Sequence, residues 1–277
     1  MRSVHSLGRR PATGSPGVAQ RSRALALRLL NKGLGLFGFQ ARESAVVRLG
    51  DVALKHDYLW YNAKKKIDIR KLDGFREIAQ RVLADGRTYL HYDRLYTLWQ
   101  AVAGIPSDAP AVAEVGAYKG GSARFIAESL RAHGRANRFY VCDTFEGHAV
   151  VDAGLDGHHK VGLQFQSTSF EAVSKYLREF DNVRVVKGDF RQASSVLAEE
   201  PAFGLAHIDV DVYQVTRFCL EFFADRLLAG GLLVVDDYGS KTCEGVKAAV
   251  DEFAAGRADY RLIHLLTSQA LLVRIAG

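Results

Sequence analysis

Between residues 68 and 102, apolar side chains recur every three or four positions, which is the spacing of helices with one buried face. The recurrence is interrupted near His91, and this divides the segment into two predicted helices. The expected buried residues are Phe75, Ile78, Ala79, Val82 and Leu83 in the first helix and Leu95, Leu98, Trp99 and Val102 in the second. Pro106 and Pro110 end the second helix, because proline cannot continue helical hydrogen bonding.

Beyond Pro110 the pattern changes to short apolar runs that alternate with helix-compatible segments. The runs predicted to be strands are residues 111–116, 138–143, 183–187, 203–209 and 232–236. A helix over residues 215–228 is expected to end at Gly230 and Gly231, since glycines often terminate helices. Alternation of strands and helices favours a parallel sheet that is covered by helices on both faces.

Two further β-like runs follow, at residues 260–265 and 270–275. Only a short turn separates them, and a parallel crossover needs about a dozen residues, so they must be antiparallel. The sequence therefore predicts an α/β, Rossmann-like fold with a seven-stranded, mostly parallel, doubly wound sheet. A C-terminal antiparallel hairpin and an N-terminal helical extension complete the predicted fold.

The first predicted strand leads into a glycine-rich turn and a helix start, within the stretch VAEVGAYKGGSARFI at residues 112–126. A helix start favours negative charge through its dipole and its unpaired backbone N–H groups. Gly116, Gly120 and Gly121 let the backbone approach a ligand closely, and Ser122 could cap the helix or hold the ligand. The stretch is either a cofactor cradle or an ordinary strand–turn–helix. It contains neither G-x-G-x-x-G nor GK[ST], which argues against a dinucleotide and a P-loop.

Acidic residues stand at or just after the end of each predicted parallel strand. They are Glu114, Asp143, Asp189, Asp209, Asp236 and Asp237. In sheets of this kind, ligands bind beyond the carboxyl ends of the strands. Asp143 follows the glycine turn by about 20 residues, the spacing of a ribose-binding acid in nucleotide-binding βαβ units. The acids therefore predict a ligand site along this edge of the sheet.

Asp209, Asp236 and Asp237 should converge, because the fourth and fifth strands are expected to be neighbours. Converging carboxylates would repel one another and raise their pKa values unless a cation joins them, and oxygen ligands suit Mg²⁺. The alternative is that these acids are helix N-caps, since each precedes a predicted helix. Asp211 could face the same site or cap the next helix, and His207 could be a satisfied core histidine.

Charge is distributed unevenly along the chain. The 37 Lys and Arg residues exceed the 31 Asp and Glu residues, but residues 1–42 contain no acid and the remainder is nearly balanced. The net charge of +6 therefore says little about the folded domain, and we expect no nucleic-acid partner. We expect residues 1–22 to be a disordered basic tail, residues 23–105 a helical lead-in, and residues 106–277 the ligand-binding domain.

The spacing of the cysteines and the hydropathy of the chain indicate in which compartment the protein is expected. The three cysteines show neither zinc-like spacing nor a paired secreted pattern, so a reducing cytoplasm is expected, with Cys142 and Cys219 as buried thiols. No apolar run approaches the ~18–20 residues of a membrane span. The apolar segment 24–39 could lie on a membrane surface, or pack on a partner subunit or on its own core. We expect a homo-oligomer, with at most peripheral membrane contact through the N-terminus.

Residues 114–122 resemble the cofactor motif of class I S-adenosylmethionine-dependent methyltransferases. Three longer blocks are similar to the macrocin O-methyltransferase family of antibiotic-sugar methyltransferases: HIDVDVYQVT at 207–216, LLAGGLLVVDDYG at 227–239 and GVKAAVDEF at 245–253. The segments RTYLHYDRLYTLWQAV at 87–102 and TSQALLV at 267–273 also fit that family. The resemblance begins at about residue 88 and implies the class I methyltransferase fold.

The resemblance also implies roles for the residues already singled out. The cofactor would be held by Glu114, Gly116 and Ser122 around its methionine part, by Asp143 at the ribose hydroxyls, and by Asp189 with Phe190 at the adenine. Mg²⁺ would be held by Asp209, Asp236 and Asp237. The glycine motif also resembles that of the Mg²⁺-dependent catechol O-methyltransferases, but Val212 stands where those enzymes have their general-base lysine.

The implied reaction is in-line attack of a sugar hydroxyl on the sulfonium methyl group of S-adenosylmethionine. A cation lowers the pKa of a bound hydroxyl, and correct positioning of the two groups accelerates the transfer further. Asp209 is the candidate for both cation ligand and proton acceptor, with Asp211 or His207 behind it. The sequence thus predicts a Mg²⁺-dependent O-methyltransferase that acts on a sugar-bearing small molecule. A catechol-like phenol or a lipid-linked glycan as acceptor, and a non-catalytic binding module of the same fold, remain as alternatives.

Overall fold

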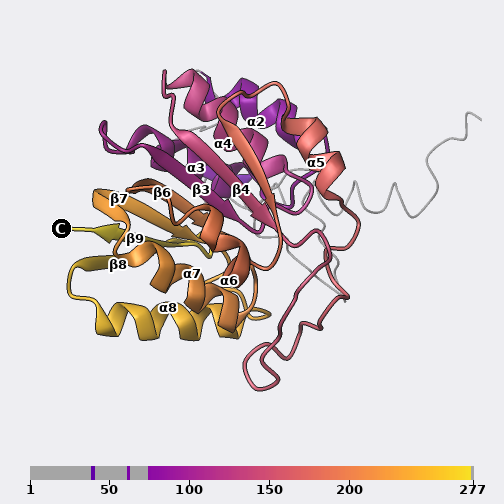
Figure 1. Cartoon of the computed structure of the whole chain (residues 1–277), viewed down its shortest axis with the longest axis vertical. Coiled ribbons are helices and arrows are strands. Elements are labelled where there is room, and N and C mark those ends of the chain that lie inside the picture. The colour runs from indigo at the N-terminus through magenta and orange to yellow at the C-terminus, as the bar shows by residue number, and fades with distance from the viewer. Residues whose placement is uncertain (1–38, 41–60, 63–73, 276–277) are drawn as a thin grey trace, which may run out of the picture. The chain divides into compact units, whose positions relative to one another are not determined.

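The computed structural model describes most of the chain, namely residues 39–40, 61–62 and 74–275 (Figure 1). Contacts within the chain divide it into two units, Met1–Asp68 and Ile69–Gly277. In the first unit, strand β1 (Phe39–Gln40) pairs with the antiparallel strand β2 (Tyr61–Asn62). The predicted tail, and all but the last residue of the apolar segment 24–39, lie outside the described residues. The predicted boundaries after residues 22 and 105 stay predictions.

A seven-stranded sheet forms the centre of the second unit. Its strands are β3 (Ala111–Val115), β4 (Arg138–Asp143), β5 (Val183–Lys187), β6 (Phe203–Ile208), β7 (Leu227–Val235), β8 (Tyr260–His264) and β9 (Ala270–Arg274). Across the sheet they follow the order β5-β4-β3-β6-β7-β9-β8. Strands β3 to β7 are parallel, and β9 runs antiparallel between β7 and β8. The predicted α/β fold with its C-terminal antiparallel hairpin is confirmed.

Helices cover both faces of this sheet (Figure 1). They are α2 (Phe75–Ala84), α3 (Tyr92–Ala103), α4 (Gly121–Ala132), α5 (Phe170–Leu177), α6 (Phe190–Ala193), α7 (Tyr213–Ala224) and α8 (Glu244–Gly256), with a short 3-10 turn η3 (Ser194–Val196) after α6. Helices α2 to α5 contribute to one hydrophobic core, and helices α6 to α8 contribute to a second. The sheet therefore separates two cores, as expected of a doubly wound fold.

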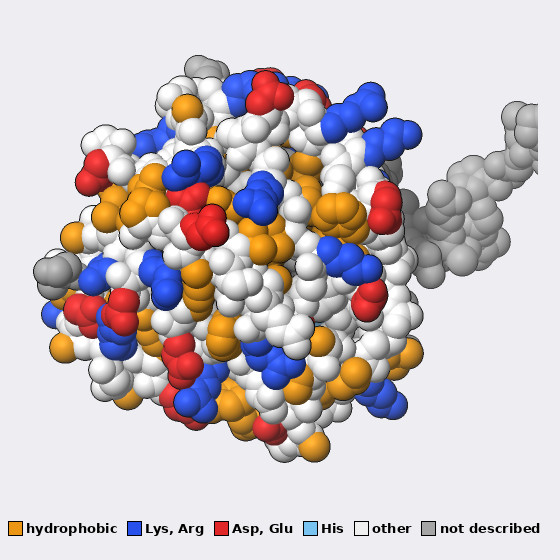
Figure 2. All heavy atoms as spheres, in the orientation of Figure 1, with side chains coloured by type: hydrophobic (Ala, Val, Ile, Leu, Met, Phe, Trp, Pro, Cys, Tyr) orange, Lys and Arg blue, Asp and Glu red, His pale blue; other side chains and the backbone are white. Residues whose placement is uncertain are grey.

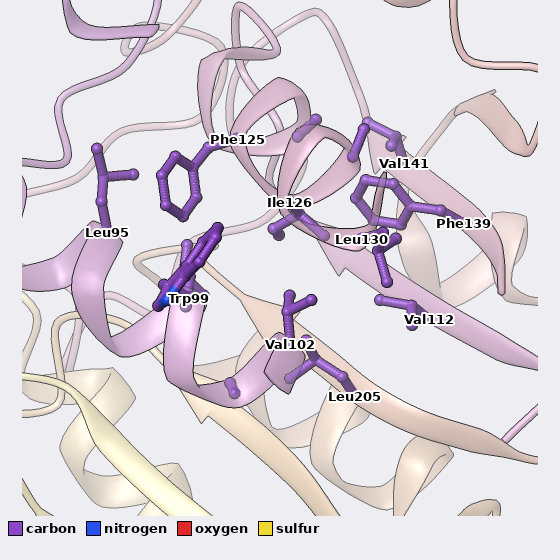
Figure 3. Close-up of a cluster of buried hydrophobic side chains, with 14 of the residues drawn as sticks. Leu95, Trp99, Val102, Val112, Phe125, Ile126, Leu130, Phe139, Val141 and Leu205 are labelled. Carbon is purple, nitrogen blue, oxygen red and sulfur yellow. The ribbon is translucent and has the colours of Figure 1, made fainter. Parts of the chain in front are cut away.

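The first core confirms the helical pattern at the start of this unit. The predicted buried residues Phe75, Ile78, Ala79 and Val82 of α2 and Leu95, Leu98, Trp99 and Val102 of α3 are buried. Leu83 is only half-buried and packs against the same core. Figure 3 shows Trp99 beside Phe125 of α4, and Val102 close to Leu205 of the sheet. Helix α3 packs against both α4 and the sheet. This packing fixes the position of the polar N-terminal turn of α3, which contributes a residue to the candidate active site.

Strand β7 begins earlier than the sequence predicts. Helix α7 ends at Ala224 rather than at the glycines, and Leu227 already pairs with Phe203 of β6. Gly230 and Gly231 lie inside β7, where the register with β6 shifts just after that pair. Gly230 has a φ of 78°, a conformation that glycine adopts in β-bulges as well as at helix ends. The prediction that these glycines end the helix is therefore wrong.

The distribution of surface charge and the burial of the cysteines are those of an ordinary globular protein. Charged side chains of both signs alternate on the face that Figure 2 shows. Cys142, Cys219 and Cys243 are free and buried, which confirms the buried thiols predicted for the first two. Within the described residues, no helix combines the length and the hydropathy that crossing a membrane would need.

Candidate active site

A cleft opens beyond the carboxyl ends of β3, β4, β5 and β6, where open α/β sheets bind their ligands. Eight of the residues singled out from the sequence line it: Gly116, Ser122, Asp143, Asp189, Phe190, Asp209, Asp211 and Asp237. Glu114, His207 and Asp236 are buried and are not among the lining residues. The topology thus brings most of the predicted site residues to one place.

The glycine turn packs against the end of β6. Gly116 has a φ of 98°, and a Cβ atom at this position would lie 1.8 Å from the carbonyl oxygen of Asp209. Asp209 donates its backbone N–H to the Val115 carbonyl at 2.9 Å, so the two strand ends are joined directly. Glycine is required at this contact because no side chain fits. Gly120 is the N-cap of α4, so the capping alternative for Ser122 is wrong, and Ser122 instead borders the cleft from the first helical turn.

Asp143 connects the end of β4 to the glycine turn. Its carboxylate accepts the N–H of Tyr118 at 2.7 Å and the N–H of Phe145 at 2.6 Å. Burial raises the pKa of this carboxyl group, and the two backbone hydrogen bonds oppose the rise. A carboxylate offers about four acceptor positions, so two amides leave capacity for hydroxyl groups of a ligand in the cleft.

Asp189 and Phe190 follow β5 and form another side of the cleft. Asp189 is the N-cap of α6, and its carboxylate accepts the Arg191 N–H at 3.0 Å. Burial would raise the pKa of Asp189, but hydrogen bonds from Arg191 outweigh burial and lower it. Phe190 stacks on Phe223 with ring centroids 5.7 Å apart. An ionised carboxylate therefore stands beside a fixed aromatic ring, and the role of both at an adenine stays a prediction.

Acids at the ends of β6 and β7 form two adjacent clusters. The first consists of His207, Asp209 and Asp236, and the second of Asp211, Asp237 and Cys243, each with its side-chain donor atoms within 4.8 Å of one another. The trio predicted to hold a cation is thus divided, with Asp237 in the second cluster. Burial and neighbouring carboxylates raise the pKa of Asp209 well above its ordinary value and that of Asp211 to about 8.

These acids are not helix N-caps, which overturns that alternative for Asp209, Asp211, Asp236 and Asp237. The N-caps of α7 and α8 are Val212 and Cys243, and neither uses its side chain as a cap. The N–H of Tyr213 at the start of α7 is accepted at 3.0 Å by Asp156, a fully buried carboxylate from the loop between β4 and α5. Sequence reasoning missed Asp156, because nothing in the sequence separates it from the solvated acids of a long loop.

A buried row of charged groups accompanies the first cluster. His207 Nδ1 lies 2.9 Å from Glu114 Oε1, and His207 Nε2 lies 3.6 Å from Asp236 Oδ2. Burial alone would lower the pKa of His207, but the two carboxylates raise it well above its ordinary value. His207 therefore fits the interpretation of a core histidine with partners on both sides. Glu114 faces His207, and its contact with a cofactor stays a prediction.

Arg94 supplies a positive charge that sequence reasoning missed. Its guanidinium donates to Asp237 Oδ1 at 3.0 Å and to Asp236 Oδ2 at 3.5 Å, and its Nε donates to the Thr267 carbonyl at 3.0 Å. Burial by itself would lower the pKa of Arg94, but the two carboxylates raise it, so the guanidinium stays charged. Arg94 lies on α3, 142 residues before Asp236, and no sequence signal joins the two.

Replacing Arg94 with glutamine is expected to destabilise the protein, because two buried or half-buried carboxylates would lose their charged partner. Breaking a fully buried ion pair costs about 3–5 kcal/mol, and the partial exposure of Arg94 reduces the expected effect to about 2 kcal/mol. Thermal unfolding with a chelator present measures it. The control is Arg217→Gln, which breaks an exposed pair with Glu221 on α7 and should change stability by at most about 0.5 kcal/mol. Equal losses in the two variants would contradict a structural role for Arg94.

The donor atoms of the two clusters fit a divalent cation. Carboxylate oxygens are the hard ligands that Mg²⁺ prefers. Among the described residues, Asp236 Oδ1 is buried and has no hydrogen-bond partner, which leaves it free for a cation. Mg²⁺ is a hard cation, so the carboxylate oxygens rather than the softer Cys243 thiol are the effective donors.

The sheet order, the antiparallel strand β9 and the cleft beyond β3 define a class I methyltransferase fold. Among solved structures, that of the O-methyltransferase NovP aligns with 92% of this chain and 100% of its own, at a TM-score of 0.60 and 23% identity. At that identity, the likeness shows the fold alone.

The chain belongs to the Macrocin-O-methyltransferase (TylF) family, whose model matches residues 53–264. This membership confirms the family resemblance of the sequence, and the match begins at residue 53, earlier than the expected start at about residue 88. A relative from Streptomyces olivaceus, 8-demethyl-8-(2,3-dimethoxy-alpha-L-rhamnosyl)-tetracenomycin-C 4'-O-methyltransferase, is 30% identical over 198 residues, which are 65% of this chain and 65% of the relative. Demethyldecarbamoylnovobiocin O-methyltransferase from Streptomyces niveus is 27% identical over 206 residues, covering 70% of this chain and 69% of that protein. The chain thus spans just under two thirds of the first relative's length.

Proposed function

We propose that this protein is an S-adenosylmethionine-dependent O-methyltransferase that methylates a sugar hydroxyl of a small molecule with the help of Mg²⁺. The observation that carries the proposal is one cleft with two chemically different sides. The glycine turn and Asp143 follow β3 and β4, toward one edge of the sheet, and Asp209, Asp211 and Asp237 follow β6 and β7, toward the other. A methyl donor and a hydroxyl acceptor can meet in such a cleft, and membership of a methyltransferase family supports this use.

The cofactor would occupy the side formed by β3, β4 and β5. Asp143 would accept the ribose hydroxyls, and Asp189 with Phe190 would border the adenine. The methionine part would lie along the glycine turn, where Gly116 has no side chain and Ser122 is half a turn into α4. The N–H groups of Tyr118 and Phe145 fix the position of the Asp143 carboxylate on this side of the cleft.

Titration calorimetry with S-adenosylmethionine is expected to show binding to the wild-type protein. Asp143→Asn keeps one acceptor oxygen for the backbone amides but loses the charge, and it should weaken binding about tenfold to a hundredfold. The matched control is Asp225→Asn at the far end of α7, which should leave the affinity unchanged. No binding by the wild-type protein would favour the alternative of a non-catalytic module.

A sugar hydroxyl is the proposed acceptor because of both the relatives and the cleft. The Streptomyces olivaceus relative is named as a 4'-O-methyltransferase of a rhamnosyl tetracenomycin. Val212 lines the cleft and is only 1% exposed, at the position where a resemblance to catechol O-methyltransferases would require a general-base lysine. The position thus carries no lysine base of the catechol O-methyltransferase type, and removal of the acceptor's proton would fall to the acids of the cleft.

Asp209 would accept the proton of the hydroxyl group, since a positioned carboxylate is an effective general base. Asp211 and Asp237 border the same part of the cleft and would orient the acceptor. Arg94 holds Asp236 and Asp237 in place through its guanidinium. When bound, Mg²⁺ would be held by Asp209, Asp236 and Asp237 and would make the acceptor hydroxyl more acidic. A cytoplasmic location and assembly into a homo-oligomer also remain predictions.

A further inference from the structure

Three aromatic rings from separate segments meet at the mouth of the cleft. The rings of Tyr89 and Tyr118 stack with centroids 5.6 Å apart and planes at 12°. Phe165 stands edge-on to both, with centroids 6.3 Å from Tyr89 and 5.4 Å from Tyr118. We call Tyr89, Tyr118 and Phe165 the aromatic cluster. Tyr89 is 70% exposed, so the cluster is not part of either hydrophobic core.

Specific contacts hold Tyr89 over the glycine turn. Arg87 donates from Nε to the Lys119 carbonyl at 2.8 Å and accepts the Gly121 N–H at 3.3 Å. A Cβ atom on Gly121 would lie 2.7 Å from the Arg87 carbonyl, so glycine is needed for this close approach. The segment before α3 is thus attached to the turn that carries Tyr118. The contacts of Arg87 with Lys119 and Gly121 therefore position Tyr89 for stacking on Tyr118.

The long loop between β4 and α5 is attached to the same turn. The Tyr118 hydroxyl lies 2.5 Å from Ser167 Oγ, and Thr168 Oγ1 donates to the Tyr118 carbonyl at 2.7 Å. Tyr118 and Phe165 have φ values of 49° and 61°, a left-handed conformation that is costly for aromatic residues. Strain of this kind persists where the surroundings enforce it and is concentrated at ligand clamps. Two of the three rings are therefore held in place at a cost in backbone energy.

The aromatic cluster forms one wall of an outer groove that continues the cleft. Tyr89, Tyr118 and Phe165 line both the cleft and the groove, and so do Arg94 and Asp237. Leu163, which is 61% exposed, adds an apolar side chain to the outer part alone. A ligand with one end at the acids can thus extend directly over the rings. The inner end of this path carries the acids, and the outer end combines the three rings and Leu163 with the polar residues Gln164, Gln166 and Ser167.

We propose that the aromatic cluster is a subsite for the aglycone of a glycosylated acceptor, and specifically for a flat aromatic aglycone. This inference rests on the proposed function, since it assumes that the sugar lies at Asp209 and Asp237. The exposed face of Tyr89 offers a stacking surface, and Phe165 closes the side of the groove. Aromatic rings prefer offset-stacked or edge-to-face partners, and the cluster presents both geometries. A sugar without an aromatic aglycone would leave this surface in water.

The test compares two acceptors that carry the same sugar: 4-methylumbelliferyl α-L-rhamnoside and methyl α-L-rhamnoside. Their affinities for the full-length protein are measured by calorimetry with S-adenosylhomocysteine and Mg²⁺ present. The wild-type protein should bind the aryl glycoside about tenfold more tightly than the methyl glycoside. Tyr89→Ala should lose most of that preference, and Tyr89→Phe should keep it. Ile263→Ala removes an exposed apolar side chain from β8, outside both linings, and should also keep the preference.

Equal binding of the two glycosides by the wild-type protein would overturn the proposed subsite. An undiminished aryl preference in Tyr89→Ala, with an unchanged melting temperature, would overturn it as well. The affinities do not depend on turnover, so they separate this inference from the proposed function. A retained aryl preference without any methyl transfer would count against the proposed reaction and leave the aglycone subsite supported.

Discussion

Asp209→Asn is expected to lower kcat for methyl transfer by about 10²–10⁴-fold, which is the usual contribution of a positioned general base. Asparagine has nearly the same shape as aspartate, but it cannot take up the proton of the acceptor hydroxyl. Asp209 lines the cleft at the end of β6, and its backbone is tied to Val115 of β3. The fold should therefore survive the substitution. Steady-state kinetics with saturating S-adenosylmethionine measures the effect.

Two measurements separate this loss from a structural one. The affinity for S-adenosylmethionine should stay within about twofold, because Asp143 follows β4 and Asp209 follows β6, on opposite sides of β3. Asp225→Asn, at the exposed end of α7, should leave kcat unchanged and serves as the matched control. If Asp209→Asn retained the wild-type kcat, the assignment of Asp209 as proton acceptor would be wrong.

Removal of divalent cations is expected to lower the rate of methyl transfer about a hundredfold or more, because a cation supplies several kcal/mol of charge stabilisation to the reacting hydroxyl. Asp236 Oδ1, buried and unpaired among the described residues, is the atom that most directly suggests a bound cation. Dialysis against a chelator followed by a rate measurement provides the test. Addition of Mg²⁺ should restore the rate.

The protein should stay folded without the cation, since Arg94 pairs with Asp236 and Asp237. The circular dichroism spectrum should therefore be unchanged by the chelator, and S-adenosylmethionine should still bind. A chelated protein that transfers methyl groups at the full rate would contradict a role for Mg²⁺. The acids would then have to orient and deprotonate the acceptor by themselves.

The fold was predictable from the sequence because each strand and helix has its own local pattern. The strands β4 and β5 occur at their predicted bounds, and the buried faces of α2 and α3 match their apolar periodicity. The glycines at 230 and 231 misled the prediction, because positive φ occurs in a bulge as readily as at a helix end. Local sequence does not state which of the two the tertiary structure uses.

The candidate site was predictable only in part, for a physical reason. Acids at the ends of parallel strands must meet at one edge of the sheet, so Asp143, Asp209 and Asp237 could be placed in advance. The partners of these acids come from distant segments. Arg94 reaches the acids from α3, and Asp156 reaches the start of α7 from a long loop. Such contacts depend on how helices and loops pack, which no spacing in the sequence records.

We expect the cleft to transfer a methyl group from S-adenosylmethionine to a sugar hydroxyl. The most direct test incubates the protein with S-adenosylmethionine carrying a ¹³C-labelled methyl group, Mg²⁺ and a panel of glycosides and catechols, and locates the label by NMR. The expected result is a labelled O-methyl group on a sugar ring of at least one glycoside. Label found only on a catechol oxygen, or no transfer to any acceptor by a protein that binds the cofactor, would contradict it.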